Sequence, residues 1–151
     1  MSTENRGLSA INSSIIPQTN PSQILAYDHV GIRVTDRNVS RAFYEKLGFV
    51  ETTYLADEQA NEMETASGVR VNLILNGAKR PDNKNILIDE PIKYPGFTHS
   101  AFVVDDIEKL QTWLQANKIA ITEGPTQFMP RRITLFIRDP DGNVIEFNQL
   151  L

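Results

Sequence analysis

A segment near the start of the chain is repeated in its second half, and this internal repeat most constrains the fold. Residues 27–36 read YDHVGIRVTD, and residues 97–106 read FTHSAFVVDD. Each copy is a strand-like run with histidine at its third position and an aspartate seven residues later, before a helical pattern begins. The only two histidines of the chain, His29 and His99, occupy the equivalent position of the repeat. A symmetric site assembled from two copies of one module needs this arrangement.

The repeat divides the chain into an arm, two modules and a linker. Residues 1–23 are polar and predict a flexible arm, residues 24–76 and 96–151 form the modules, and residues 77–95, with three prolines, form the linker. The hydrophobic pattern predicts strand, helix and three strands in each module, which is an α+β fold with two βαβββ units. The expected strands are 26–34, 49–55, 61–65 and 69–76 in the first module, and 97–104, 119–123, 131–138 and 143–149 in the second.

Two helices are expected directly after the repeated segments. The first begins after Asp36 or Asn38 and ends at Gly48, because these residue types cap helices at those positions. The second runs from residue 107 to about 117, after Asp105 or Asp106.

Composition and charge exclude several classes of partner. The net charge is −4, and Lys and Arg form no patch, so nucleic acid is not an expected partner. The absence of cysteine removes disulfides, thiolate nucleophiles and cysteine metal ligands. No apolar stretch is long enough to cross a bilayer, and the first residues are a poor secretory signal. We therefore expect a soluble cytoplasmic protein without a membrane partner.

The two faces of the predicted strands differ in chemistry, since side chains alternate along a strand. One face is apolar and is expected to pack beneath the helices: Val30, Ile32, Val34, Val71, Leu73, Leu75, Phe102, Val104, Ile133, Leu135, Ile137, Ile145 and Phe147. The other face is mixed and is expected to line a pocket: His29, Gly31, Arg70, Asn72, His99, Ala101, Arg132, Thr134, Phe136, Glu146 and Asn148.

Repeat equivalence favours a metal site on the mixed face. A shift of 70 positions places His29 on His99, and a shift of 74 further along the chain places Asn72 on Glu146. A lone strand histidine is usually structural, and a lone strand carboxylate is usually solvated. A pseudo-twofold axis would nevertheless bring all four residues to one point. Two histidines and one glutamate can bind a divalent ion facially and leave positions open for a substrate, so His29, His99 and Glu146 are the expected ligands.

Several motifs resemble the vicinal oxygen chelate superfamily, which includes glyoxalase I, fosfomycin-resistance enzymes, extradiol dioxygenases and bleomycin-resistance proteins. The motifs are Asp28-His29-Val30, Ala42-Phe43-Tyr44, Leu47-Gly48-Phe49, residues 98–102 (THSAF) and residues 138–147 (RDPDGNVIEF). The resemblance covers residues 24–150. It implies a cupped mixed β-sheet of the glyoxalase-like fold, a homodimer, and a metal ion (Zn, Ni, Mn or Fe) held at His29, His99 and Glu146. In many relatives the first histidine comes from one subunit and the other ligands from its partner.

Departures from the subfamily patterns narrow the choice. Asn72 stands where glyoxalase I normally supplies a fourth protein ligand, so an unmodified glyoxalase I mechanism is not expected. Thiol-transferring fosfomycin enzymes place Thr where this chain has Gly31, and polar residues where it has residues 128–130 (FMP). Extradiol dioxygenases use a third histidine, which this chain lacks, and bleomycin-binding relatives have no metal ligands.

The leading interpretation is a metal-dependent enzyme that acts on a small molecule with two neighbouring oxygens, by glyoxalase-like lyase or isomerase chemistry. The metal ion would act as a Lewis acid. A base is then needed, and Glu62 is the best candidate because its repeat equivalent, Phe136, lies on the mixed face. Glu58 and Glu64 lie an even number of residues from Glu62 and are the alternative bases. The rivals are an extradiol-type dioxygenase and a protein that binds a drug or metabolite through the metal.

Five further residues are expected to contact the substrate. Asn72 lies on the mixed face, and Arg70 and Arg132 could hold an anionic group or form surface ion pairs. Met129 and Phe136, with the neighbouring Phe128, would form an apolar wall or fill the sheet edge.

Overall fold

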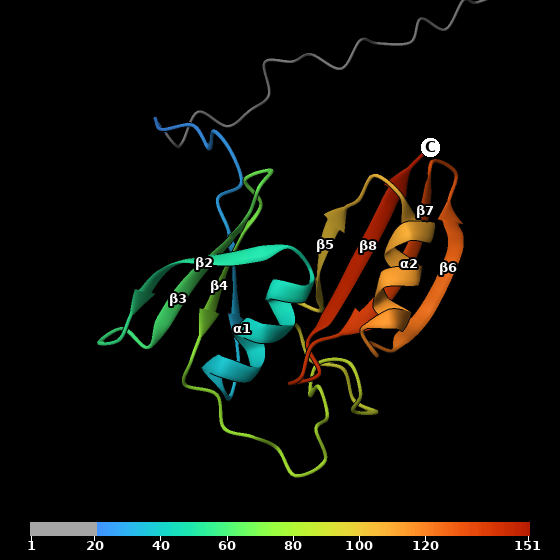
Figure 1. The fold of residues 1–151 in the computed structure, drawn as a ribbon. Coiled ribbons are helices and arrows are strands. Elements are labelled where there is room, and N and C mark those ends of the chain that lie inside the picture. Colours follow the sequence, from blue (N-terminus) through green and yellow to red (C-terminus); the bar gives the residue numbers. More distant parts are fainter. Residues whose placement is uncertain (1–20) are drawn as a thin grey trace, which may run out of the picture.

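The computed structural model describes residues 21–151, which form two similar modules side by side (Figure 1). Residues 1–20, and with them most of the expected arm, lie outside the described part. The first module contains β1 (Val30–Arg33), α1 (Arg37–Lys46), β2 (Phe49–Leu55), β3 (Ala60–Thr65) and β4 (Arg70–Ile74). The second contains β5 (His99–Val103), α2 (Ile107–Ala116), β6 (Ile121–Met129), β7 (Arg132–Arg138) and β8 (Val144–Leu150).

Each module folds into one four-stranded mixed sheet. The strand orders are β1-β4-β3-β2 and β5-β8-β7-β6, and in each sheet the first pair is parallel and the others are antiparallel. The predicted α+β fold with two βαβββ modules is therefore confirmed. Within residues 21–151, no helix is long and apolar enough to cross a membrane.

The aspartates that end the repeated segments start the two helices. The Asp36 side chain accepts a hydrogen bond from the backbone N–H of Val39, and the Asp106 side chain accepts from the N–H groups of Glu108 and Lys109. Each aspartate satisfies backbone donors that have no partner within the helix. Of the alternatives open from the sequence, the structure therefore selects Asp36 and Asp106.

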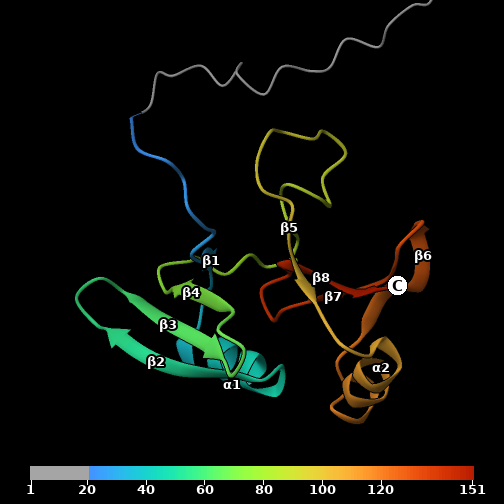
Figure 2. The same ribbon diagram turned by 90° about the horizontal axis from the view of Figure 1, so that it is seen from above.

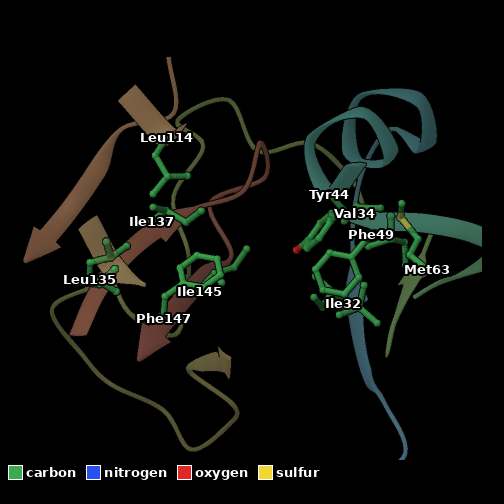
Figure 3. Close-up of a cluster of buried hydrophobic side chains, with 13 residues drawn as sticks. Ile32, Val34, Tyr44, Phe49, Met63, Leu114, Leu135, Ile137, Ile145 and Phe147 are labelled. Atoms are coloured by element: carbon green, nitrogen blue, oxygen red, sulfur yellow. The ribbon is translucent and has the colours of Figure 1, made fainter. Parts of the chain in front are cut away.

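The apolar strand faces pack beneath the helices in both modules. Figure 3 shows two groups of buried side chains that face each other, with Val34, Phe49 and Met63 in one and Leu114 and Ile145 in the other. All residues predicted on the apolar face are buried or pack against the buried cluster. Rings of the two modules meet where Phe49 contacts Phe102 edge-on, with 5.8 Å between ring centroids.

The turn that leads into β8 ties the two modules together. Asp139 is buried, and its carboxylate accepts hydrogen bonds from the backbone N–H groups of Asp141 and Asn143 and from the hydroxyl of Tyr44 in α1. Burial raises the pKa of the Asp139 carboxyl, although these hydrogen bonds act in the opposite direction. The Asp141 carboxylate accepts from the backbone N–H and the hydroxyl of Thr35, just after β1. The turn therefore fixes the end of β1 relative to the start of β8.

Several predicted strands differ from the observed ones in length, and the differences are largest for β1 and β6. β1 and β5 begin later than the predicted residues 26 and 97, because their parallel partners pair with them only from Val30 and His99 onward. β6 was expected to end at residue 123 but continues to Met129. Pro125 does not end it, because β6 is an edge strand with irregular register, where a missing N–H and a bulge are tolerated.

The segment between β4 and β5 has no helix or strand, but an ion pair attaches it to the second module. Arg138 at the end of β7 donates two hydrogen bonds to Asp89, at 2.6 and 2.7 Å. This bidentate contact and a backbone N–H from Asn85 lower the pKa of the Asp89 carboxyl to about 2.

Replacing Asp89 with asparagine is expected to lower the free energy of unfolding at pH 6 by up to about 1 kcal/mol, because a partly exposed bidentate pair is lost. The folded-state pKa lies below the ordinary 3.8, so the contribution is present above pH 3.8 and disappears as the pH falls toward 2. Urea unfolding of both proteins between pH 6 and pH 2 measures this. A difference that stays constant across this range would contradict it.

Candidate functional site

A cavity of about 1000 Å³ lies between the two modules. Its walls include β1 and β5, which face the space between the sheets when the molecule is seen from above (Figure 2). Asp28, Gly31 and Arg70 line it from the first module, and His99 and Ala101 line it from the second. The repeated segments thus meet at one cavity.

In the second module, His99 and Glu146 are already in contact. His99 Nε2 lies 2.8 Å from Glu146 Oε2, and the Glu146 side chain is 14% exposed. The contact follows from the sheet, because Ala101 pairs with Glu146 in the parallel register of β5 and β8. His99 Nδ1 lies 2.9 Å from the hydroxyl of Thr98, so the two side chains that flank the imidazole hold its orientation.

In the first module, His29 is held by an acid instead of a hydroxyl. Its Nδ1 lies 2.5 Å from Asp28 Oδ2, and the other oxygen of Asp28 pairs with Arg70. The hydrogen bond from His29, together with the nearby positive charge of Arg70, lowers the pKa of the Asp28 carboxyl. Because a carboxylate only accepts hydrogen bonds, Nδ1 of His29 is the donor in this contact, and Nε2 is the nitrogen that the neutral ring can offer to a ligand.

The sheet registers place Asn72 and Glu62 as the repeat predicts. Asn72 pairs with Gly31 on one side and with Glu62 on the other, in the same way as Glu146 pairs with Ala101 and Phe136. Asn72 Oδ1 is buried and has no hydrogen-bond partner among residues 21–151. Glu62 is half-buried and accepts a 3.3 Å hydrogen bond from the hydroxyl of Thr52.

The predicted donor atoms are of types that bind a divalent ion, but a single chain does not bring all of them to one point. Imidazole Nε2 atoms and a carboxylate oxygen suit Zn, Ni, Mn or Fe, and the unpartnered oxygen of Asn72 is a further acceptor on the same face. Among residues 21–151 of a single chain, no three His, Asp or Glu side chains are close enough to hold a metal ion. His99 and Glu146 are brought together, whereas His29 does not join them.

The other predicted contact residues fall into two groups. Phe136 lies opposite Glu146 and packs edge-on against the His99 ring, with 6.1 Å between centroids, and Phe128 packs on Phe136. Arg132 instead pairs with Met129 and Leu150. Leu150 is four residues along β8 from Glu146, which corresponds to about 13 Å at the rise of a strand. Arg132 and Met129 therefore lie at the other end of the sheet.

Sequence reasoning missed the residues that hold the two histidines. Asp28 and Thr98 each precede a histidine and occupy equivalent positions of the repeat. Their equivalent positions in the repeat could have indicated that both contact the neighbouring histidine. Thr134 and Asn148 were expected on the pocket face, but both are buried, with 2% and 3% of their surfaces exposed.

Known proteins are similar to this chain over most of its length. The family model described as Glyoxalase/Bleomycin resistance protein/Dioxygenase superfamily matches residues 26–147. The glyoxalase domain-containing protein RDO1 of Mycosarcoma maydis is 28% identical over 129 residues, which are 83% of this chain and 68% of that protein. The metallothiol transferase FosB of Staphylococcus saprophyticus is 28% identical over 127 residues, which are 83% of this chain and 77% of that protein.

Solved structures share the fold. A glyoxalase/dioxygenase from Nostoc punctiforme superposes with a TM-score of 0.65 at 24% identity, covering 87% of this chain and 99% of that one. The antibiotic-binding protein TnmS3 from Streptomyces sp. CB03234 also gives 0.65, at 21% identity and 86% and 99% coverage. The family match spans both modules and both repeated segments, and the chain therefore belongs to the Glyoxalase/Bleomycin resistance protein/Dioxygenase superfamily.

Proposed function

We propose that this protein is a metal-dependent enzyme that carries out lyase or isomerase chemistry on a small molecule with two neighbouring oxygens. The observation that carries the proposal is the 2.8 Å contact between His99 Nε2 and Glu146 Oε2 beside the cavity. A nitrogen and a carboxylate oxygen at this spacing are two of the three donors of a facial site. The name of the similar metallothiol transferase supports the metal-dependent part of the proposal.

We propose that His29 completes the site from a second subunit. Within residues 21–151, His29 stays apart from the His99–Glu146 pair, and the edges of β1 and β5 that face the cavity pair with no other strand of that range. Unpaired edges are surfaces on which a second copy can dock, and a homodimer with twofold symmetry would form two equal sites. Each site would take His29 from one subunit and His99 and Glu146 from the other.

The residues around the ligands have separate roles in this proposal. His29, His99 and Glu146 would hold the divalent ion, which would supply Lewis-acid chemistry to the oxygens of the substrate. Asp28 fixes the protonated nitrogen of His29, and Arg70 holds Asp28 in place. Phe136 forms an apolar wall against His99. Glu62, next to Asn72 in the sheet, acts as the base that removes a proton from the substrate.

Replacing Glu146 with glutamine is expected to weaken metal binding and abolish turnover. The substitution removes the only anionic ligand and leaves an amide, a weaker oxygen donor. Titration calorimetry with Mn²⁺, Ni²⁺ and Zn²⁺ measures the affinity. Equal affinity in the folded variant would exclude Glu146 as a ligand.

Replacing Glu62 with glutamine should leave metal content unchanged and lower turnover about 10²–10⁴-fold, since a general base contributes a factor of this size. The active substrate is first sought among α-ketoaldehyde–thiol adducts, epoxides and catechols with several divalent ions. Glu64→Gln on the same strand is the matched control and is expected to retain turnover. Full turnover of Glu62→Gln would move the base to another group.

A further inference from the structure

Behind Glu146, a buried polar pair continues the contacts of the site. The Thr134 hydroxyl donates to Asn148 Oδ1 at 2.6 Å, and Asn148 Nδ2 donates to Glu146 Oε1 at 2.8 Å. Glu146 Oε2 is then the oxygen that meets His99. Four side chains on β7, β8 and β5 thus form one connected chain of polar contacts.

The fold itself does not require this polar pair. Thr134 and Asn148 face each other across β7 and β8, and the equivalent pair in the first module, 74 positions earlier, is Ala60 and Ile74 across β3 and β4. The first module therefore builds the same sheet with two apolar residues. It also carries Asn72 where the second module carries Glu146. The polar pair occurs in the module that has the carboxylate.

The order of the hydrogen bonds determines which oxygen of Glu146 is free. A hydroxyl that donates to Asn148 Oδ1 forces the other end of the amide, the NH₂ group, to face Glu146. The amide then engages Oε1, and Oε2 remains for the site. Because Thr134 and Asn148 are buried, neither can exchange its partner for bulk water.

We infer that Thr134 and Asn148 are positioning residues that hold Glu146 in a single orientation and so set the affinity of the site for a divalent ion. This inference rests on the proposed metal-dependent function. Mutation of a residue that hydrogen-bonds to a metal ligand typically lowers metal affinity about 10–100-fold. The pair therefore acts on the metal through Glu146 and touches neither metal nor substrate.

The repeat supplies the test variant and its control. Thr134→Ala with Asn148→Ile gives the second module the pair found in the first, so the fold is expected to tolerate it. Ala60→Thr with Ile74→Asn makes the reverse exchange where no carboxylate ligand exists. The dissociation constants of Mn²⁺, Ni²⁺ and Zn²⁺ are measured by calorimetry on the full-length protein, and melting temperatures are measured without metal.

The expected result is a metal dissociation constant about 10–100-fold higher in the first double variant. Wild-type affinity is expected in the reverse variant. Thr134→Val, which lacks only the hydroxyl, should weaken binding, and Thr134→Ser should restore it. If the double variant does not fold, these two single variants test whether the Thr134 hydroxyl affects metal affinity. Unchanged metal affinity in the double variant and in Thr134→Val would overturn the positioning role but not the proposed function. A wild-type protein that binds none of the three ions would overturn both.

Discussion

Replacement of His99 with alanine is expected to abolish stoichiometric binding of a divalent ion. The variant removes one of three proposed donors, and Glu146 keeps its hydrogen bond from Asn148. The loss should exceed the ~10–100-fold effect of an outer-shell residue, because a ligand is removed from the metal itself. Metal analysis of protein purified after loading with Mn²⁺, Ni²⁺ or Zn²⁺ measures the effect.

The His99→Ala variant is expected to fold, so a loss of metal from it can be assigned to the missing ligand. The His99 side chain is 38% exposed and stands on the pocket face of β5, away from the apolar core. We expect the melting temperature of the metal-free variant to stay within a few degrees of the wild type, as is usual for surface substitutions. Phe136→Leu, which keeps an apolar contact to His99, is the matched control and should retain the ion. Unchanged metal content in folded His99→Ala would contradict the site.

The repeat allowed much of the fold to be predicted, because each copy contains its own local signals. Asp36 and Asp106 are equivalent helix caps, and the alternation of apolar residues identified the buried face of both sheets. Strand ends were less predictable, since a strand extends only as far as its partner. Residues 26–29 precede Val30, which is the first residue that pairs with β4.

The candidate site was predictable only in part. Offsets of 70 and 74 positions identified His99 and Glu146, and the register of β5 and β8 brings them together. The pairing of the modules was not predictable, because a 19-residue linker allows them to meet within one chain or between two. The roles of Asp28 and Thr98 depend on side-chain directions that a strand pattern does not specify.

If the site is shared between subunits, two inactive variants should restore each other. Neither His29→Ala nor His99→Ala alone has a complete set of donors. In a dimer with one chain of each kind, however, one site combines the intact His29 of the second variant with the intact His99 and Glu146 of the first. When equal amounts associate at random, half of all dimers are heterodimers, and each heterodimer has one complete site. Metal content should therefore rise from none to about one ion per four chains. Co-refolding followed by metal analysis measures this.

A site formed within one chain predicts the opposite result, because every chain in that mixture lacks a donor and no ion binds. The control mixes the wild type with the double variant His29→Ala/His99→Ala, whose heterodimers have no complete shared site. Such a mixture should hold about one ion per four chains if sites are shared, and about one per two if they are not. Light scattering checks that all species are dimers of about twice the 17.0 kDa chain mass. Because the shared arrangement needs β1 of one subunit to reach β8 of the other, a monomer at micromolar concentration would contradict it as directly as a failed rescue.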